Sequence, residues 1–214
     1  MDQMASSVGG VVAIDFADAA APQVEPVSFD FSTSGYALCI VDTGGNHADL
    51  TAEYAAIPEE MCAVAKYFGA QVLSEVSANQ VMQAIPALRK ACGDRAVLRA
   101  IHFYREDRRA QGECEAFLRL VQNSGESSYC LLQNVYPCSA PQEQPISIAL
   151  AVGTALLGGR GAIRVHGGGF GGTIQAFVPD VLLTCFQEGM EAALGKGCCH
   201  ILRIRPVGGT VILN

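Results

Sequence analysis

A glycine-rich hexapeptide is the stretch of this sequence whose composition most clearly indicates a site. Gly167 to Gly172 reads GGGFGG, with five glycines in six positions. Such a backbone is needed where φ is positive, where two backbones lie close together, or where the chain approaches a ligand closely. The composition alone leaves these three uses open.

The residues around the hexapeptide argue against the common phosphate-binding loops. No Gly-Lys-Ser/Thr follows it, as would be the case in a Walker A loop. The flanking apolar runs, Ala162–Val165 and Thr173–Val178, predict strand, loop and strand, so no helix N-terminus points at the loop. A tight structural hairpin and a ligand-facing loop both remain open. His166 beside it is expected to be hydrogen-bonded structure rather than a catalyst.

The elements around this hairpin predict an α+β fold. Further strands are expected at Val11–Phe16, Val27–Phe31, Tyr36–Thr43 and His200–Arg205, and helices at 51–68, 77–91, 94–112, 113–122, 146–157 and 180–194. Tyr36–Thr43 is continuously apolar and is expected to be covered on both faces. Pro58 is expected to kink or restart the first of these helices. We expect one sheet layered with helices, with a split βαβ core of the ferredoxin-like kind.

Composition narrows the class of protein. The chain has 214 residues, half of them apolar, which predicts a folded globular domain. Its net charge of -7 disfavours a nucleic acid partner. No uncharged run is long enough to span a bilayer, so we expect no membrane partner. The nine cysteines include no CxxC pair and are interpreted as reduced core residues of a soluble, cytoplasmic protein.

Residues 165–179, VHGGGFGGTIQAFVP, resemble the third conserved motif of the GHMP small-molecule kinases in the form typical of galactokinases. Four further segments resemble galactokinase segments in the same order. These are Met1–Gly10 with the following VVAIDF, Ile40–Tyr54, Asn123-Ser124 and Ile204–Gly209. The resemblance covers essentially the whole chain.

The resemblance implies the C-terminal domain of a galactokinase-like kinase. Residues 36–214 would form that domain, and residues 1–35 would belong to the inter-domain region. A galactokinase is about twice as long, and no GLSSS-like phosphate loop is found here, so the N-terminal half is expected to be absent. The parent protein would transfer the γ-phosphate of ATP, with Mg²⁺, to galactose or a related sugar. This chain alone is expected to be inactive and to bind no cofactor.

Site residues follow from the same resemblance. Asp2 matches the catalytic Asp that takes the proton of the sugar's anomeric hydroxyl, although an Asp beside a chain end can also be merely solvated. Tyr54 matches a sugar-contacting Tyr, with core packing as the alternative. The hexapeptide residues Gly167, Gly168, Gly169, Phe170, Gly171 and Gly172 would support the phosphate loop of the absent half. No metal ligand is expected. After Glu53-Tyr54 the family's basic run is replaced by AAIPEE.

Two other functions remain open at this stage. One is another GHMP kinase specificity, for an amino-sugar, a mevalonate-type or a homoserine-type substrate. The other is a non-catalytic sugar-sensing or interaction module that kept the fold. The absent N-terminal kinase domain is the expected partner. Its removal would expose apolar side chains such as Phe170 and favour self-association through the inter-domain face.

Overall fold

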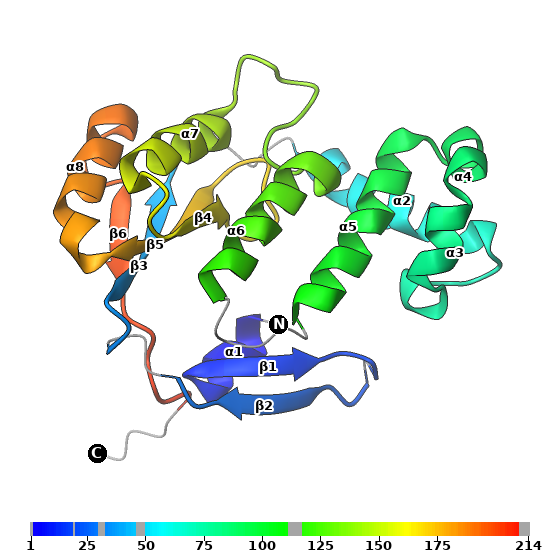
Figure 1. The fold of residues 1–214 in the computed structure, drawn as a ribbon, viewed down its shortest axis with the longest axis horizontal. Helices are drawn as coiled ribbons and strands as arrows, with labels where there is room; N and C mark the ends of the chain where they lie inside the picture. Colours follow the sequence, from blue (N-terminus) through cyan, green and yellow to red (C-terminus); the bar gives the residue numbers. More distant parts are fainter. Residues whose placement is uncertain (1, 19, 30–32, 46–49, 111–116, 210–214) are drawn as a thin grey trace.

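The computed structural model describes residues 2–18, 20–29, 33–45, 50–110 and 117–209. These residues form a main layered body and a small two-stranded sheet beside it (Figure 1). The main body contains the glycine-rich hairpin, and the small sheet carries the N-terminal helix. Each of the two positions a different part of the candidate site.

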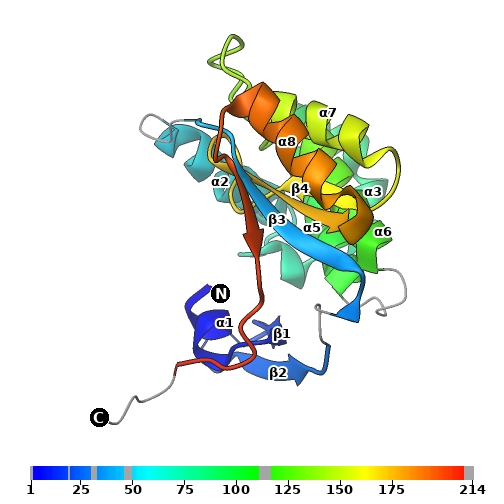
Figure 2. The same cartoon turned by 90° about the vertical axis from the view of Figure 1, so that its left-hand side faces the viewer.

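The main sheet has four strands in the order β4-β5-β3-β6. They are β4 (Ala162–Val165), β5 (Thr173–Pro179), β3 (Tyr36–Asp42) and β6 (Cys199–Leu202). Every neighbouring pair is antiparallel. Helices α7 (Pro145–Leu157) and α8 (Leu183–Leu194) pack on one face, where Val41, Ile174 and Phe186 belong to one buried cluster (Figure 2). This arrangement confirms the predicted α+β fold with a split βαβ core.

Two details of the sheet differ from the sequence prediction. In β3 only Cys39 and Val41 are fully buried, while Leu38 and Ile40 are half-buried, so the strand is not covered on both faces as predicted. The helices α7 and α8 cover a single face, and the opposite face of β3 borders an open groove. The last strand, β6, ends at Leu202 and not at Arg205, because the chain then leaves the sheet towards the small one (Figure 2).

A second layer of helices lies beside the sheet. Its members are α2 (Thr51–Tyr67), α3 (Ala78–Gln83), α4 (Ile85–Ala91), α5 (Asp94–Ala110) and α6 (Phe117–Ser127), with a short 3₁₀ turn η2 (Leu73–Glu75) and a π-helical turn η4 (Ser128–Leu132). Ser77 caps α3 with a reciprocal capping box to Gln80, as its position predicted. Helix α2 runs through Pro58 without a restart and begins at Thr51, with no side-chain cap from Leu50. From the sequence, Asp49 or Thr51 could cap this helix; Thr51 is instead its first residue, and Asp49 lies outside the described residues.

The small sheet pairs β1 (Val11–Asp15) with β2 (Gln23–Val27), and α1 (Asp2–Val8) precedes it. The second strand was predicted at Val27–Phe31 and lies earlier, with Val27 opposite Val11. Pro26 is tolerated within β2 because this is an edge strand, where an N–H group is not required on the open side. That residues 1–35 form a unit separate from residues 36–214 stays a prediction.

The cysteines are distributed differently from the prediction. Those of the described ranges are free, but Cys130, Cys138 and Cys185 are exposed and therefore are not core residues. Cys130 lies in η4, Cys138 in the loop after it and Cys185 in α8, each on the side of its segment that faces solvent. Cys114 lies outside the described residues. Among the described helices, none combines the length and apolar character needed to cross a bilayer.

Candidate functional site

The glycine-rich hexapeptide connects β4 to β5 as predicted, and its backbone needs the freedom that glycine provides. Gly167, Gly169 and Gly172 have φ of 67°, 82° and 86°, in the left-handed region. Phe170 also has a positive φ of 58°, which is uncommon for a residue with a side chain. The first of the three uses of glycine, positive φ, is therefore confirmed.

The second use, close backbone approach, is found on the inner side of the loop. A Cβ atom on Gly169 would lie 2.0 Å from the backbone oxygen of Asn134. The same oxygen accepts a hydrogen bond from Phe170 N–H at 2.5 Å, and Asn134 Nδ2 donates to the Gly168 oxygen at 3.1 Å. Asn134 follows Gln133, whose φ of 56° ends the π-helical turn η4. The loop thus rests directly on the chain after η4.

Tyr54 on α2 holds the loop from another side. Its hydroxyl donates to the backbone oxygen of Gly169 at 2.6 Å, and its ring meets Phe170 edge-on at 5.3 Å between centroids. A Cβ atom on Gly168 would lie 2.6 Å from the Tyr54 ring. Burial raises the pKa of the Tyr54 phenol above its ordinary value, so the hydroxyl stays a donor at neutral pH. The packing alternative for Tyr54 is therefore present in the structure, whereas its sugar contact stays a prediction.

The end of β3 completes the support of the loop. Thr43 donates to the Gly172 oxygen twice, from its backbone N–H at 2.9 Å and from its hydroxyl at 2.7 Å. Gly45 lies so close that a Cβ atom there would be 3.2 Å from the Gly171 Cα. Three separated segments of sequence, after β3, within α2 and after η4, therefore converge on one hairpin.

This support buries Phe170, which is only 3% exposed. The expectation that Phe170 would be uncovered near the hairpin is wrong, because its ring packs against Tyr54 and its N–H is bonded to Asn134. The apolar side chains that are exposed lie elsewhere, among them Phe29 after β2, Ile148 on α7, Val181 before α8, and Ile201 and Leu202 on β6.

The outer side of the loop faces solvent. His166, Gly167 and Gly168 are exposed. His166 Nδ1 lies 3.0 Å from the Thr173 hydroxyl, which is the structural role expected for it. Within the described ranges, the backbone N–H groups of Gly167 and Gly168 have no acceptor. The third use of glycine, a close approach to a ligand, is therefore sterically open at Gly167, whereas at Gly168 the Tyr54 ring occupies the side where a Cβ atom would lie.

Asp2 is the first residue of α1, and its side chain lies outside what the structure describes. In the galactokinase segment that Met1–Gly10 and VVAIDF resemble, an Asp-Gln pair precedes a short helix and a strand; here Asp2 and Gln3 open the short helix α1, and the strand β1 follows. No group of three or more His, Cys, Asp or Glu residues in the described part of the chain is arranged to hold a metal ion.

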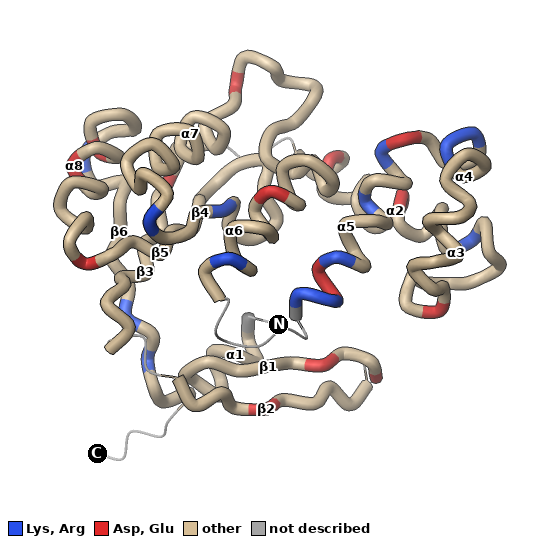
Figure 3. Tube along the Cα trace, viewed as in Figure 1, with Lys and Arg blue, Asp and Glu red and all other residues tan. Residues whose placement is uncertain are grey.

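A buried polar network beside the loop was not predicted from the sequence. Arg99 on α5 is fully buried, donates to the Leu132 oxygen at 3.1 Å and pairs with Glu60 at 3.0 Å. Arg95, one turn earlier, pairs with the same Glu60 at 2.6 Å. Figure 3 shows how positive and negative residues intersperse along α5. The helical spacing of Arg95 and Arg99 was a usable signal, since residues four apart share one face.

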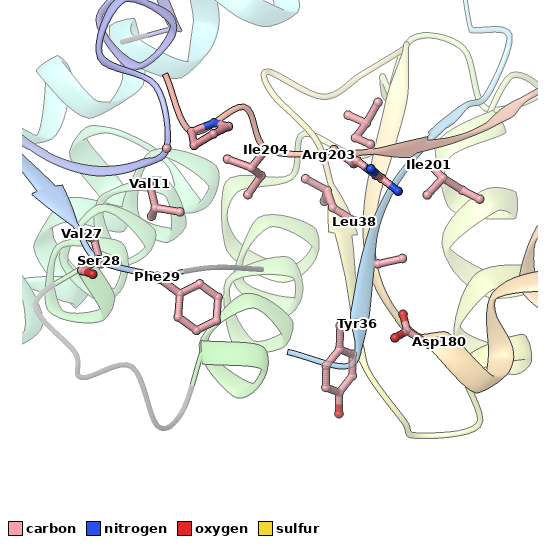
Figure 4. Close-up of a pocket in the computed structure, with 14 residues that line it drawn as sticks. Val11, Val27, Ser28, Phe29, Tyr36, Leu38, Asp180, Ile201, Arg203 and Ile204 are labelled. Carbon is pink, nitrogen blue, oxygen red and sulfur yellow. The ribbon is translucent and has the colours of Figure 1, made fainter. Parts of the chain in front are cut away.

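A groove of about 940 Å³ separates the small sheet from the main one. Val11, Val27 and Phe29 line one side, and Tyr36 and Leu38 belong to the other (Figure 4). Phe29, Ile201 and Leu202 are each more than two-fifths exposed there, at 46%, 47% and 44%. Neither Tyr54 nor a residue of the glycine loop lines the groove. Ser28, Asp180 and Arg203 also line it, so it is a surface of mixed apolar and polar character and not part of the loop site.

Comparison with known proteins points to one group of enzymes. No protein-family model matches the chain. It is 27% identical over 185 residues to a galactokinase of Actinobacillus pleuropneumoniae serotype 3, a match that covers 84% of this chain and 46% of that protein. It is 28% identical over 183 residues to a galactokinase of Haemophilus influenzae, with the same coverage of 84% and 46%. The chain thus spans about half the length of the curated relatives it matches.

Solved structures give the same picture for the fold. Lactococcus lactis galactokinase complexed with galactose superposes with a TM-score of 0.64 at 18% identity, covering 94% of this chain and 53% of that one. The L. major mevalonate kinase in complex with R-mevalonate superposes with a TM-score of 0.53 at 13% identity, covering 97% and 53%. The resemblance found in the motifs is confirmed: the chain is similar to galactokinases over most of its length and fits the C-terminal domain of a GHMP kinase.

Proposed function

From this likeness to the C-terminal domain of a galactokinase-like kinase, we propose that the protein containing this chain transfers the γ-phosphate of ATP to galactose or a related sugar. The observation that carries the proposal is the sequence similarity to galactokinases across 84% of the chain. Since the chain spans less than half of those relatives, the catalytic unit would include a further part of about equal size. We place the reaction in the cytoplasm, where ATP and the sugar are both present.

In the proposed reaction Asp2 is the general base at the sugar hydroxyl. A carboxylate suits this step because phosphoryl transfer depends mainly on positioning and charge stabilisation. Tyr54 would contact the sugar from α2 while its hydroxyl holds Gly169. The glycine loop would support the phosphate-binding segment of the other part of the kinase, through its exposed residues Gly167 and Gly168.

The described residues fit one part of MgATP, its phosphate oxygens, better than its metal ion. The unbonded N–H groups of Gly167 and Gly168 are suited to an anionic oxygen. Within the described ranges, however, no metal-holding cluster accompanies them. The nucleotide would supply the transferred phosphoryl group. This chain's own residues would orient the sugar and receive its proton, and we assign the Mg²⁺ ligands to the part of the kinase that the chain does not span.

The groove between the two sheets is the surface that this further part would cover. Its lining is mixed, and the exposed apolar side chains Phe29, Ile201 and Leu202 within it are typical of an interface that is buried in the complete protein. When residues 1–214 are alone in solution, we expect self-association through this face. Light scattering that shows a monodisperse monomer at high concentration would count against this expectation.

The function is tested with the longer protein. A panel of galactose, an amino-sugar, mevalonate and homoserine, each with MgATP, should give the highest kcat/KM with galactose or a closely related sugar. A preference for mevalonate or homoserine would reject the sugar assignment. If the chain were instead a non-catalytic sugar-sensing module, residues 1–214 alone would bind galactose or ATP in a calorimetric titration. We expect no such binding.

A further inference from the structure

The segment after β6 joins the two ends of the chain. It leaves the main sheet at Leu202 and runs along the small sheet beside α1 (Figure 2). Gly10 N–H donates to the Arg205 oxygen at 2.8 Å, and Gly209 N–H donates to the Ser7 oxygen at 3.0 Å. The Arg205 guanidinium also lies 3.4 Å from the Ser6 oxygen. We call residues 203–209 the C-terminal clasp.

Two glycines allow the clasp to touch the end of α1. A Cβ atom on Gly208 would lie 1.8 Å from the Ser7 oxygen, and one on Gly9 would lie 2.3 Å from the carbonyl carbon of Val207. Both obstacles are backbone atoms, which cannot turn aside as a flexible side chain can. Gly209, next to the crossing, has nothing within 4 Å of its Cβ position. The close contact is therefore confined to Gly9 and Gly208.

The small unit has little else to fix it to the main body. Its elements α1, β1 and β2 pack chiefly on one another. Helix α1 has seven residues, fewer than an isolated helix needs for stability in water. A two-stranded sheet is also marginal without a third strand or a packed helix. Within the described residues, the clasp supplies the hydrogen bonds that tie α1 to the end of the main sheet.

We propose that the C-terminal clasp fixes α1 relative to the main sheet and that Gly9 and Gly208 are thereby positioning residues for Asp2. The inference rests on the proposed function for the role of Asp2, but not for the existence of the clasp. The clasp meets α1 at Ser6 and Ser7, and Asp2 lies five residues from Ser7 in the same helix, roughly 7.5 Å along its axis. A helix transmits a shift at one end to the other. In reactions that depend on near-attack geometry, a displacement of about 1 Å can cost on the order of a hundredfold in rate.

The clasp is tested on residues 1–214 by amide hydrogen exchange in Gly208→Ala and in the matched control Gly209→Ala. Each change adds one methyl group to one of two adjacent glycines, but only the methyl group at position 208 would collide with backbone atoms. We expect Gly208→Ala to speed exchange of the Gly10 amide and of α1 by about tenfold or more, since it breaks hydrogen bonds of the clasp. Gly209→Ala should stay within about twofold of the unchanged chain. Equal exchange of α1 in the two variants would overturn the proposal.

A second variant covers the case in which Gly208→Ala does not fold. A chain that ends at Leu202 keeps β6 and loses the clasp. It should retain slow exchange in β3 and β5 while α1 exchanges faster by about tenfold. Unchanged protection of α1 in this shortened chain would also overturn the proposal.

The positioning role is tested separately in the longer protein. Gly208→Ala should lower kcat for the sugar by about tenfold or more while KM for ATP is unchanged, and Gly209→Ala should change neither. If exchange separates the two variants but kcat does not, the positioning role is refuted. If the unchanged longer protein phosphorylates no sugar, the proposed function fails, and the exchange experiment still decides whether the clasp holds α1.

Discussion

Replacement of Gly169 by alanine tests most directly how the glycine loop is held. The new methyl group would lie 2.0 Å from the Asn134 oxygen, so the loop and the chain after η4 must separate. Two hydrogen bonds between them, Phe170 N–H to the Asn134 oxygen and Asn134 Nδ2 to the Gly168 oxygen, would be lost. At about 1 kcal/mol each they contribute about 2 kcal/mol. The positive φ of 82° adds about 1–2 kcal/mol for a residue with a Cβ.

Gly167→Ala is the matched control. Gly167 also has a positive φ, of 67°, but nothing lies within 4 Å of its Cβ position. The free energy of unfolding of Gly167→Ala should therefore fall only by the cost of backbone strain, about 1–2 kcal/mol. The effect of losing a glycine on the unfolded chain is the same for both changes and cancels. The free energy of unfolding of the two variants should differ by about 2 kcal/mol.

Urea denaturation of the two variants and the unchanged chain measures this difference. A gap of about 2 kcal/mol corresponds to roughly 4–8 °C in Tm for a chain of this size. If Gly167→Ala and Gly169→Ala destabilise the fold equally, close packing of Gly169 on Asn134 is not what requires glycine there. The interpretation of the loop as a supported hairpin would then be wrong.

Three other predictions follow from the contacts of the main body. Tyr54→Phe keeps the ring packing but removes one of the two donors to the Gly169 oxygen, which keeps its bond from Gly171 N–H at 2.7 Å. It should therefore cost about 1 kcal/mol in urea denaturation, and a neutral effect would show that the Tyr54 bond does not stabilise the loop. Arg99→Ala should cost about 3 kcal/mol of stability, because it removes the fully buried partner of an ion pair. Arg95→Ala should cost under about 1 kcal/mol, because that side chain is 37% exposed. If thermal unfolding gave the reverse order, burial would not be what makes the Arg99 ion pair the more important one. Burial lowers the pKa of His102 below its ordinary value of about 6.5, so the unfolded chain binds the proton more readily than the folded chain. The stability from neutral His102 should be fully present above about pH 6.5 and fall at lower pH. Between pH 7.5 and 5.5 a His102→Asn variant should therefore lose less stability than the unchanged chain in the same thermal assay.

Much of the fold could be predicted from local patterns in the sequence. Ser77 caps its helix, Gly158 ends α7 in the left-handed region, and the glycine hexapeptide lies between two antiparallel strands. Each of these features depends on residues a few positions apart, which is the range over which backbone preferences act.

Features that depend on distant segments were not predictable in the same way. The Asn134 contact joins the loop to a residue 34 positions from Gly168. One face of β3 is half-buried because α7 and α8 pack only on the other face. The apolar run in its sequence does not indicate which faces the helices cover. The burial of Phe170 likewise depends on Tyr54, more than a hundred residues away. The clasp joins the two ends of the chain, and its signal was limited to the two glycine pairs Gly9-Gly10 and Gly208-Gly209.

The central claim is that this chain forms one wall of a sugar kinase whose other wall lies in a further part of the protein. Its most direct test is a measurement of ATP-dependent phosphorylation of galactose, with Mg²⁺, by residues 1–214 alone and by the longer protein at equal concentration. We predict turnover by the longer protein and none above the blank for residues 1–214. Measurable turnover by residues 1–214 alone would contradict the claim.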